Sequence, residues 1–257
     1  LLGQKINDEE KILMEPVIYY HNQNSKNIRE LLTDHLGLYY SIDIKDIKII
    51  KDIISYIHNA SLVIDDIQDE SQLRRNKPCA HIVYGIASSI NASYLIIFKV
   101  LKEINKRTDL SEEIIHNITE YIYYAHIGQG LDIYYTEHKI IPPIHKYEEL
   151  IEYKTGMLFY PILDLMVFKT NNKIIENKND EIRTCLKKFA LFFQIRDDYI
   201  NITSKKYWEE RGFCQDFDEK KISYLITFCT NNKMDKFKKI NKLMEKDNKT
   251  NKYKIRI

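Results

Sequence analysis

Residues that turn a chain sharply are scarce in this sequence, which has 7 glycines and 5 prolines among 257 residues. Strand-rich folds need many tight turns, and glycine and proline usually form them. Helical folds need far fewer tight turns. The sequence therefore predicts an all-α fold, and its length suits a single domain spanning residues 1–257.

Apolar residues recur at helical spacing along much of the chain. The clearest stretch runs from Ile47 to Ile64 and leads into an acidic cluster. Further helical stretches are predicted at Ala87–Lys106, Ser111–Tyr134, Lys146–Lys169, Ile182–Ile200 and Ser223–Cys229. Non-helical segments are predicted at Ser71–Pro78, Pro142–Pro143 and Thr170–Asp180, and residues 231–257 form a lysine-rich C-terminal segment.

The overall charge balance and the cysteines narrow the classes of function. The net charge is +2, from 39 basic and 37 acidic residues, which argues against nucleic acid as the main partner. The 4 cysteines form no CxxC pair, and the first residues do not resemble a signal peptide. No run of 18 apolar residues occurs, so we expect no membrane span and a cytoplasmic location.

Three carboxylates follow the first helical stretch: Asp65, Asp66 and Asp69. Asp65 and Asp69 are four residues apart, so on a helix they project from one face, with Asp66 alongside. Carboxylates this close repel one another unless cations bind them, and their oxygens suit Mg²⁺. Taken alone, such a cluster is more often a solvated helix end than a metal site.

A second acidic cluster favours the metal site. Asp197 and Asp198 again lie on an otherwise apolar helical stretch, with Gln194 four residues before Asp198. Two such helices can face each other across the cavity of a helical bundle, with metal ions and a diphosphate between them. Cations follow each cluster, at Arg74, Arg75, Arg211 and Lys221, and guanidinium groups bind phosphate oxygens well.

These motifs together resemble those of the trans-type polyprenyl diphosphate synthases, most closely the eukaryotic geranylgeranyl diphosphate synthases. The first acidic region spans His58–Asp69 and continues through Leu73-Arg74-Arg75 to Pro78, and the second spans Phe192–Asn201. Between them, Gly128–Tyr134 and Lys154-Thr155-Gly156 resemble two further motifs of that family. The likeness extends in order from about Glu15 to Cys229, and it implies a helical bundle around a central apolar cavity.

The resemblance also implies a role for each matching residue. Isopentenyl diphosphate would be bound by Lys26, Arg29, His58 and Arg75. The allylic diphosphate would be bound by Arg74, Lys154, Thr155, Gln194, Arg211 and Lys221. The implied catalytic set is Asp65, Asp66, Asp69, Asp197, Asp198 and Lys154, with Asp65, Asp69 and Asp197 binding up to three Mg²⁺ ions. A homodimer or a larger homo-oligomer is implied as well.

Several positions depart from the family pattern. Ser25, Asn76, Met157 and Lys220 stand where glycine is usual, and Arg211 replaces a lysine. Arginine keeps the charge of lysine. A lost glycine matters where the backbone has a positive φ, a conformation that asparagine tolerates better than most residues.

The residues just before the first acidic cluster bear on product length. Ala60 and Ser61 lie about one helical turn before Asp65 and are small, whereas relatives with shorter products usually carry aromatic residues there. We therefore expect farnesyl diphosphate to be extended to geranylgeranyl diphosphate (C20). Tyr94 and Phe98 are alternative candidates for the pocket floor.

Two alternatives stay open. One is a terpene synthase on the same fold, which would act on a single allylic diphosphate and would not need Lys26, Arg29, His58 and Arg75. The other is a non-catalytic regulatory subunit of a prenyl synthase. Such subunits typically lose one acidic motif, and both motifs are present here.

Overall fold

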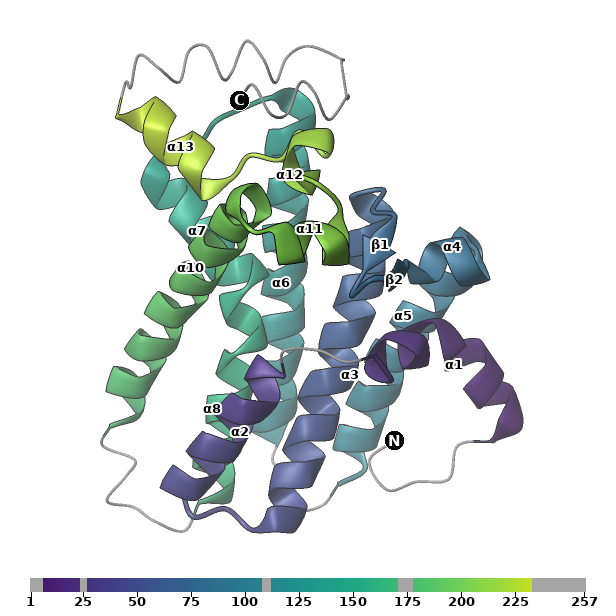
Figure 1. Cartoon of the computed structure of the whole chain (residues 1–257). Helices are drawn as coiled ribbons and strands as arrows, with labels where there is room; N and C mark the ends of the chain where they lie inside the picture. Colours follow the sequence, from purple (N-terminus) through teal and green to yellow (C-terminus); the bar gives the residue numbers. More distant parts are fainter. Residues whose placement is uncertain (1–6, 24–26, 108–111, 171–177, 233–257) are drawn as a thin grey trace.

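The computed structural model describes residues 7–23, 27–107, 112–170 and 178–232. Its described residues are almost entirely helical, which confirms the predicted all-α fold. The long helices α3 (Ile44–Gln68), α5 (Ile86–Asn105), α6 (Glu112–His138) and α10 (Asn179–Thr203) form a bundle (Figure 1). Around them lie α1 (Asp8–His21), α2 (Ile28–Tyr39), α4 (Ala80–Tyr84), α7 (Ile144–Lys154), α8 (Tyr160–Lys169), α11 (Lys205–Arg211), α12 (Gln215–Asp218) and α13 (Tyr224–Asn231).

Helix α3 shows how the sequence builds the bundle. The side chain of Asp43 caps its N-terminus by accepting a hydrogen bond from Lys45 N. Its apolar side chains recur at helical spacing, and the buried residues include Ile50, Ile53 and Ile57. Each buried isoleucine stabilises the fold by about 1.5–3 kcal/mol relative to an exposed one. This packing fixes which face of α3 carries the acidic cluster.

The core has two parts. The larger cluster of buried apolar side chains joins α1, α3, α5, α6, α8 and α10. A smaller cluster joins α7 to α13 through Tyr147, Leu150, Ile151, Ile222 and Ile226. The described helices include none that is both long enough and apolar enough to cross a bilayer.

Of two further predicted segments, one agrees with the structure and one does not. The stretch Ser71–Pro78, predicted to be non-helical, holds a small antiparallel hairpin of β1 (Leu73–Arg74) and β2 (Lys77–Pro78). The single helical stretch predicted at Lys146–Lys169 is wrong, because a 3₁₀ turn at Gly156–Leu158 separates α7 from α8. Pro161 in the first turn of α8 lacks a backbone N–H, so it can begin a helix but would break a continuous one.

Other predicted boundaries are close to the observed ones. Pro142 and Pro143 separate α6 from α7 as expected, and α10 begins at Asn179, three residues before the predicted start. Helices α1, α2, α4, α11 and α12 were not predicted. Ser111 and nearly all of the lysine-rich segment lie outside the described residues.

Candidate active site

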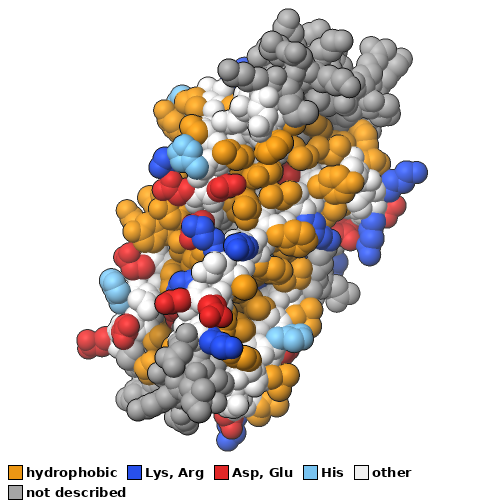
Figure 2. Space-filling view, turned by 90° about the vertical axis from the view of Figure 1, so that its left-hand side faces the viewer, with side chains coloured by type: hydrophobic (Ala, Val, Ile, Leu, Met, Phe, Trp, Pro, Cys, Tyr) orange, Lys and Arg blue, Asp and Glu red, His pale blue; other side chains and the backbone are white. Residues whose placement is uncertain are grey.

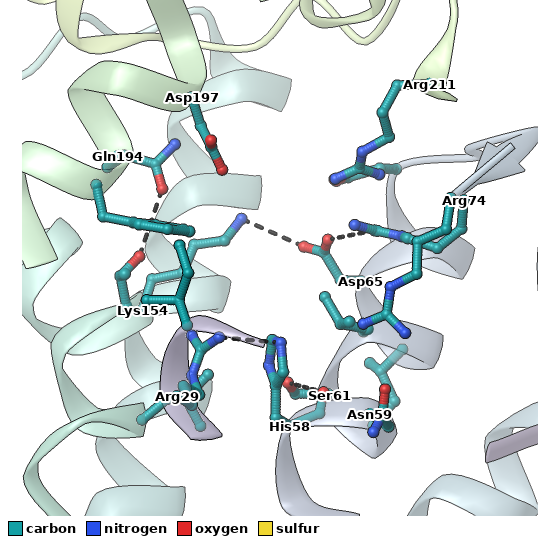
Figure 3. A pocket seen from close by; sticks show the side chains of 18 of the residues that line it. Arg29, His58, Asn59, Ser61, Asp65, Arg74, Lys154, Gln194, Asp197 and Arg211 are labelled. Atoms are coloured by element: carbon teal, nitrogen blue, oxygen red, sulfur yellow. Dashed lines mark hydrogen bonds and ion pairs between the residues drawn. The ribbon is translucent and has the colours of Figure 1, made fainter. Parts of the chain in front are cut away.

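A pocket of about 870 Å³ opens among α2, α3, α6, α7 and α10, and the hairpin, α11 and α12 also line it. Asp65 of α3 and Asp69 just after its end line one wall, and Asp197 and Asp198 of α10 line another. Figure 3 shows Asp197 and Gln194 on the opposite side of the pocket from Asp65 and Arg74. The two acidic clusters therefore face a shared space.

The second aspartate of the first cluster, Asp66, is held by the protein. Its side chain is fully buried and does not line the pocket. One carboxylate oxygen accepts hydrogen bonds from Arg74 Nη2 and from Arg211 Nη1, the latter at 3.4 Å. The other accepts from Arg74 Nε at 2.8 Å and from the Tyr20 hydroxyl at 2.5 Å. With two donors on each oxygen, Asp66 anchors the hairpin and α11.

Asp198 occupies a similar position in the second cluster. It accepts hydrogen bonds from Gln194 Nε2 at 2.9 Å and from the backbone N–H of Tyr224 at 2.7 Å. Burial raises the pKa of Asp198 to about 6, although both donors and Lys221 favour the ionised form. In each Asp-Asp pair, therefore, protein donors hold the second carboxylate.

Lys154, at the end of α7, connects two acidic residues. Its Nζ lies 2.6 Å from Asp132 Oδ2 on α6 and 3.3 Å from Asp65 Oδ1 on α3. Burial alone would lower the pKa of Lys154, but the carboxylates of Asp132, Asp65 and Asp69 outweigh burial and the Lys221 charge and raise it. The ammonium group is therefore held in its charged form at the pocket wall.

Gly128 on α6 allows α7 to come close enough for this contact. A Cβ at this position would lie 2.4 Å from the backbone N of Lys154 and 2.8 Å from the carbonyl carbon of Tyr153. No side chain fits there without moving backbone. This glycine therefore sets the position of Lys154.

Asp65 and Asp69 respond differently to their surroundings. Burial opposes ionisation of both, but the cations Lys154, Lys221, Arg74 and Arg211 outweigh it at Asp65 and lower its pKa. At Asp69, burial and the neighbouring Asp65 charge prevail over Lys221, which lies 3.6 Å away, and raise the pKa to about 6. Ionisation of Asp69 beside the ionised Asp65 is therefore costly unless further cations bind nearby.

A second polar group lies deeper, where α2 meets α3. Arg29 Nη1 lies 3.0 Å from His58 Nε2, and the guanidinium also stacks over the Phe159 ring. Burial, and then the charges of Arg29 and Arg75, lower the pKa of His58 well below its usual value, so the ring is neutral. Arg75 Nη1 donates to the Tyr20 carbonyl at 2.8 Å.

Most of the predicted site residues line this one pocket: Arg29, His58, Ser61, Asp65, Asp69, Arg74, Arg75, Lys154, Thr155, Gln194, Asp197, Asp198, Arg211 and Lys221. Thr155 and Gln194 also contact each other, at 3.4 Å. Lys26 lies outside the described residues, and Asp66 lies behind the wall.

The pocket floor differs from the expectation at Ala60. Ala60 is fully buried in the core and does not line the pocket, whereas Ser61 does. Tyr94 and Phe98 do not line it either, because both are exposed on α5. Ile54 and Leu158 line the pocket and also border a small apolar void of about 10 Å³ beneath it.

The departures from glycine have different structural consequences. Asn76 and Lys220 adopt φ values of 64° and 54°, a region that favours glycine. Met157 does not have a positive φ, so glycine is not needed there for backbone reasons. Ser25 lies outside the described residues.

Three site residues were missed in the sequence. Asp216 and Glu219 line the pocket, and the Glu219 carboxylate accepts a hydrogen bond from Ser71 at 3.1 Å. Asp132 lies within the Gly128–Tyr134 motif, but its role depends on a lysine 22 residues further along. The only signal for Asp216 and Glu219 was their closeness in sequence to Lys221.

The donor chemistry of the pocket fits a hard divalent cation. Carboxylates lie on both walls, and the buried Asp65 Oδ1 accepts no hydrogen bond and has only the ion pair with Lys154, at 3.3 Å. Within the described ranges, no three His, Cys, Asp or Glu side chains are close enough to hold an ion by themselves. Mg²⁺ usually takes one or two carboxylates and completes its shell with water and substrate phosphate oxygens.

Comparison with known proteins gives a consistent result. A family model described as polyprenyl synthetase matches residues 10–256. The geranylgeranyl pyrophosphate synthase olcC of Penicillium canescens is 34% identical over 243 residues, which cover 95% of this chain and 71% of the relative. The geranylgeranyl pyrophosphate synthase paxG of Penicillium paxilli is 38% identical over 219 residues, or 84% of this chain and 56% of the relative.

A longer relative also matches. The bifunctional sesterterpene synthase astC of Talaromyces wortmannii is 36% identical over 221 residues, which cover 85% of this chain. The chain spans only 28% of the length of that relative.

Proposed function

The chain belongs to the polyprenyl synthetase family, and from that premise we propose that it joins isopentenyl diphosphate to an allylic diphosphate, releasing diphosphate. One arrangement supports the proposal: Asp65 and Asp69 share a pocket with Asp197, and cationic side chains surround all three. Such a pocket can bind an anion that gains charge as it departs.

The allylic diphosphate would lie between the two acidic clusters. Lys154, Arg74, Arg211 and Lys221 would bind its oxygens, together with Thr155 and Gln194. Asp65, Asp69 and Asp197 would hold Mg²⁺, which would supply Lewis-acid stabilisation to the leaving diphosphate. Because these groups are already fixed by Asp66, Asp132 and Asp198, little reorganisation is needed as charge develops.

The carbon chain would occupy the apolar part of the pocket. Ile54, Leu62, Leu158 and Phe193 line it and would keep water from the allylic cation. Isopentenyl diphosphate would bind at Arg29, His58, Arg75 and Lys26, and its double bond would attack the cation. Transfer of a proton from the resulting cation to the released diphosphate would then complete the coupling.

We propose geranylgeranyl diphosphate as the product and farnesyl diphosphate as the primer. The small side chain of Ser61 lines the pocket one turn below Asp65, which leaves room for a growing chain. The names of olcC and paxG state the same product for those proteins.

The two alternatives are weaker on specific grounds. A terpene synthase acting on one substrate has no use for a second diphosphate-binding group, yet Arg29, His58 and Arg75 line the same pocket as the acidic clusters. A regulatory subunit needs neither acidic cluster. In this chain both clusters are present, and hydrogen-bond donors hold one carboxylate of each.

An elongation assay tests the proposal. Purified protein with Mg²⁺, farnesyl diphosphate and labelled isopentenyl diphosphate should yield a labelled C20 diphosphate by chromatography. A product that stays at C15 would contradict the chain length. Hydrocarbon release from farnesyl diphosphate alone would favour the terpene synthase, and no turnover at all would favour the regulatory subunit.

We also propose a homodimer formed through α5. Ile86, Ile90, Tyr94 and Phe98 are exposed at one-turn spacing, and no charged residue occurs between Ile86 and Phe98. By contrast, the face shown in Figure 2 mixes apolar patches with many Lys, Arg, Asp and Glu side chains. An apolar stripe on one helix can pair with its own copy across a twofold axis.

A cytoplasmic location is proposed on the basis of the cysteines. Among the described residues, Cys79, Cys185 and Cys229 are free thiols, which suits a reducing compartment. Fractionation of cells that express the tagged chain would test this location.

A further inference from the structure

The C-terminal end of α1 holds the hairpin that carries Arg74 and Arg75. The Tyr19 hydroxyl donates to the Pro78 carbonyl at 3.0 Å, and the Tyr20 hydroxyl accepts from the backbone N–H of Ala80 at 3.1 Å. On the other side of the hairpin, the backbone N–H of Asn76 donates to the Glu210 carbonyl of α11 at 3.1 Å. The two arginines therefore sit on a segment fixed from both sides.

Tyr20 does more than hold the backbone. Its side chain is fully buried, and its hydroxyl donates to Asp66 Oδ2 at 2.5 Å. Asp66 in turn binds Arg74 through both carboxylate oxygens. The hydroxyl thus fixes the plane of the carboxylate that orients the Arg74 guanidinium.

The same residue also contacts Arg75 through its backbone. The Tyr20 carbonyl accepts a hydrogen bond from Arg75 Nη1 at 2.8 Å. Tyr20 therefore acts on Arg74 through Asp66, and it contacts Arg75 directly. A substitution that removes only the hydroxyl would disturb the first contact and leave the second in place.

We propose that Tyr20 is a positioning residue that orients Arg74 toward a bound diphosphate by fixing Asp66. The assignment of Arg74 to diphosphate rests on the proposed function. Without the hydroxyl, Asp66 Oδ2 keeps Arg74 Nε as its single donor, so the Asp66–Arg74 pair can shift together and Arg74 loses its fixed direction. Arg75, held by the Tyr20 carbonyl, keeps its place.

The test is Tyr20→Phe, with Tyr19→Phe as the matched control. Both substitutions remove one phenolic hydroxyl from α1, but the Tyr19 hydroxyl contacts only the hairpin backbone among the bonds the structure describes. Inorganic diphosphate is titrated calorimetrically in MgCl₂ at about 10 °C. We expect Kd to rise about tenfold for Tyr20→Phe, the order of a lost hydrogen bond to a charged group, and less than about twofold for Tyr19→Phe.

A double-mutant cycle separates positioning from general destabilisation. If Tyr20 acts through Arg74, Tyr20→Phe should add little to the effect of Arg74→Ala on diphosphate binding. Effects that simply add would overturn the proposal, as would an unchanged Kd in Tyr20→Phe. A Tyr20→Phe chain that is unfolded at the titration temperature would make Tyr20 a folding residue and would also overturn it.

Kinetics supply a second readout. In the elongation assay, kcat should fall while KM for isopentenyl diphosphate stays within about threefold, because the carbonyl bond to Arg75 persists. If KM for isopentenyl diphosphate rose by the same factor as kcat fell, the assignment to Arg74 would be contradicted. A wild-type chain that binds diphosphate but forms no product would refute the proposed function. The role of Tyr20 would then be decided by the diphosphate titration alone.

Discussion

The ammonium group of Lys154 lies 3.3 Å from a carboxylate oxygen of Asp65, so α7 and α3 meet through opposite charges at the pocket (Figure 3). Asp65 also lies 3.2 Å from Arg74 Nη2. This carboxylate therefore stands between two cations that we assign to the allylic diphosphate. It is the residue whose loss should matter most to the chemistry.

Asp65→Ala should lower the elongation rate by at least about a hundredfold, because it removes a proposed magnesium ligand and leaves Lys154 and Arg74 with one anion fewer. The measurement is incorporation of labelled isopentenyl diphosphate. Asp46→Ala is the control, since Asp46 lies on the same helix but pairs with Lys169 away from the pocket. Equal activity of the Asp65 variant and the wild type would refute the metal assignment.

Product length should respond to the pocket floor. Ser61→Phe fills space one turn below Asp65 and should shorten the product to C15. Leu158→Ala should lengthen it beyond C20, because this side chain separates the pocket from the void beneath. Chromatography of the products decides both, and unchanged lengths in both variants would show that the floor lies elsewhere.

Stability should depend on pH through Asp216. Burial raises the pKa of Asp216 from its ordinary value of 3.8 to about 7, with Asp198 and Asp69 adding to the rise and Lys221 and Arg211 opposing it. The folded state then binds more protons than the unfolded state between these two values, so this stabilisation is complete below about pH 4 and is lost as the pH rises to about 7.

Asp216→Asn should make this part of the pH dependence disappear. A tenfold change in proton affinity on folding corresponds to about 1.4 kcal/mol, but the Asp216 side chain is only partly buried at the pocket wall, so we expect a change of about 1 kcal/mol. Urea unfolding in metal-free buffer at about pH 5 and about pH 7.5 measures it, on either side of the raised pKa. A variant that keeps the full wild-type difference between the two pH values would contradict the assignment to Asp216.

Restoring glycine should stabilise the chain only where φ is positive. Lys220→Gly should raise the free energy of unfolding by up to about 1 kcal/mol, because a left-handed backbone costs about 1–2 kcal/mol without glycine. Met157→Gly is the matched substitution at a position without positive φ, where it removes a buried side chain and should cost at least about 2 kcal/mol. Thermal or urea unfolding compares the two, and a destabilised Lys220→Gly chain would oppose the backbone argument.

The proposed dimer predicts that a charge on α5 weakens self-association. Phe98→Glu should shift the chain from dimer to monomer in sedimentation or light-scattering measurements. Phe168→Glu on α8 is the control, because it places the same charge on another exposed phenylalanine. A wild-type chain that is monomeric at all concentrations would contradict the proposed dimer. A Phe98 variant that remains dimeric would contradict its formation through α5.

Sequence periodicity was enough for the long helices, because Ile50, Ile53 and Ile57 repeat on one buried face of α3. The hairpin was missed because its strands have two residues each, too few to show alternation. The break before α8 was missed because Met157 and Leu158 continue the apolar pattern into Pro161.

The site could be predicted residue by residue only where a side chain acts near its own motif. Asp65 and Asp197 are examples, since helical spacing alone turns them toward the pocket. The anchoring of Asp66 depends on Tyr20, 46 residues earlier, and on Arg211, 145 residues later. The choice between Ala60 and Ser61 as a lining residue depends on how α3 is rotated against its neighbours, which packing decides.

The walls of the pocket come from distant parts of the chain, because α2 and α3 line it together with α10 to α12. During synthesis on the ribosome, the first acidic helix emerges long before its counterpart. Until the later helices arrive, the carboxylates and apolar side chains of α3 face water or a chaperone. The pocket is therefore complete only after α10 to α12 have left the exit tunnel.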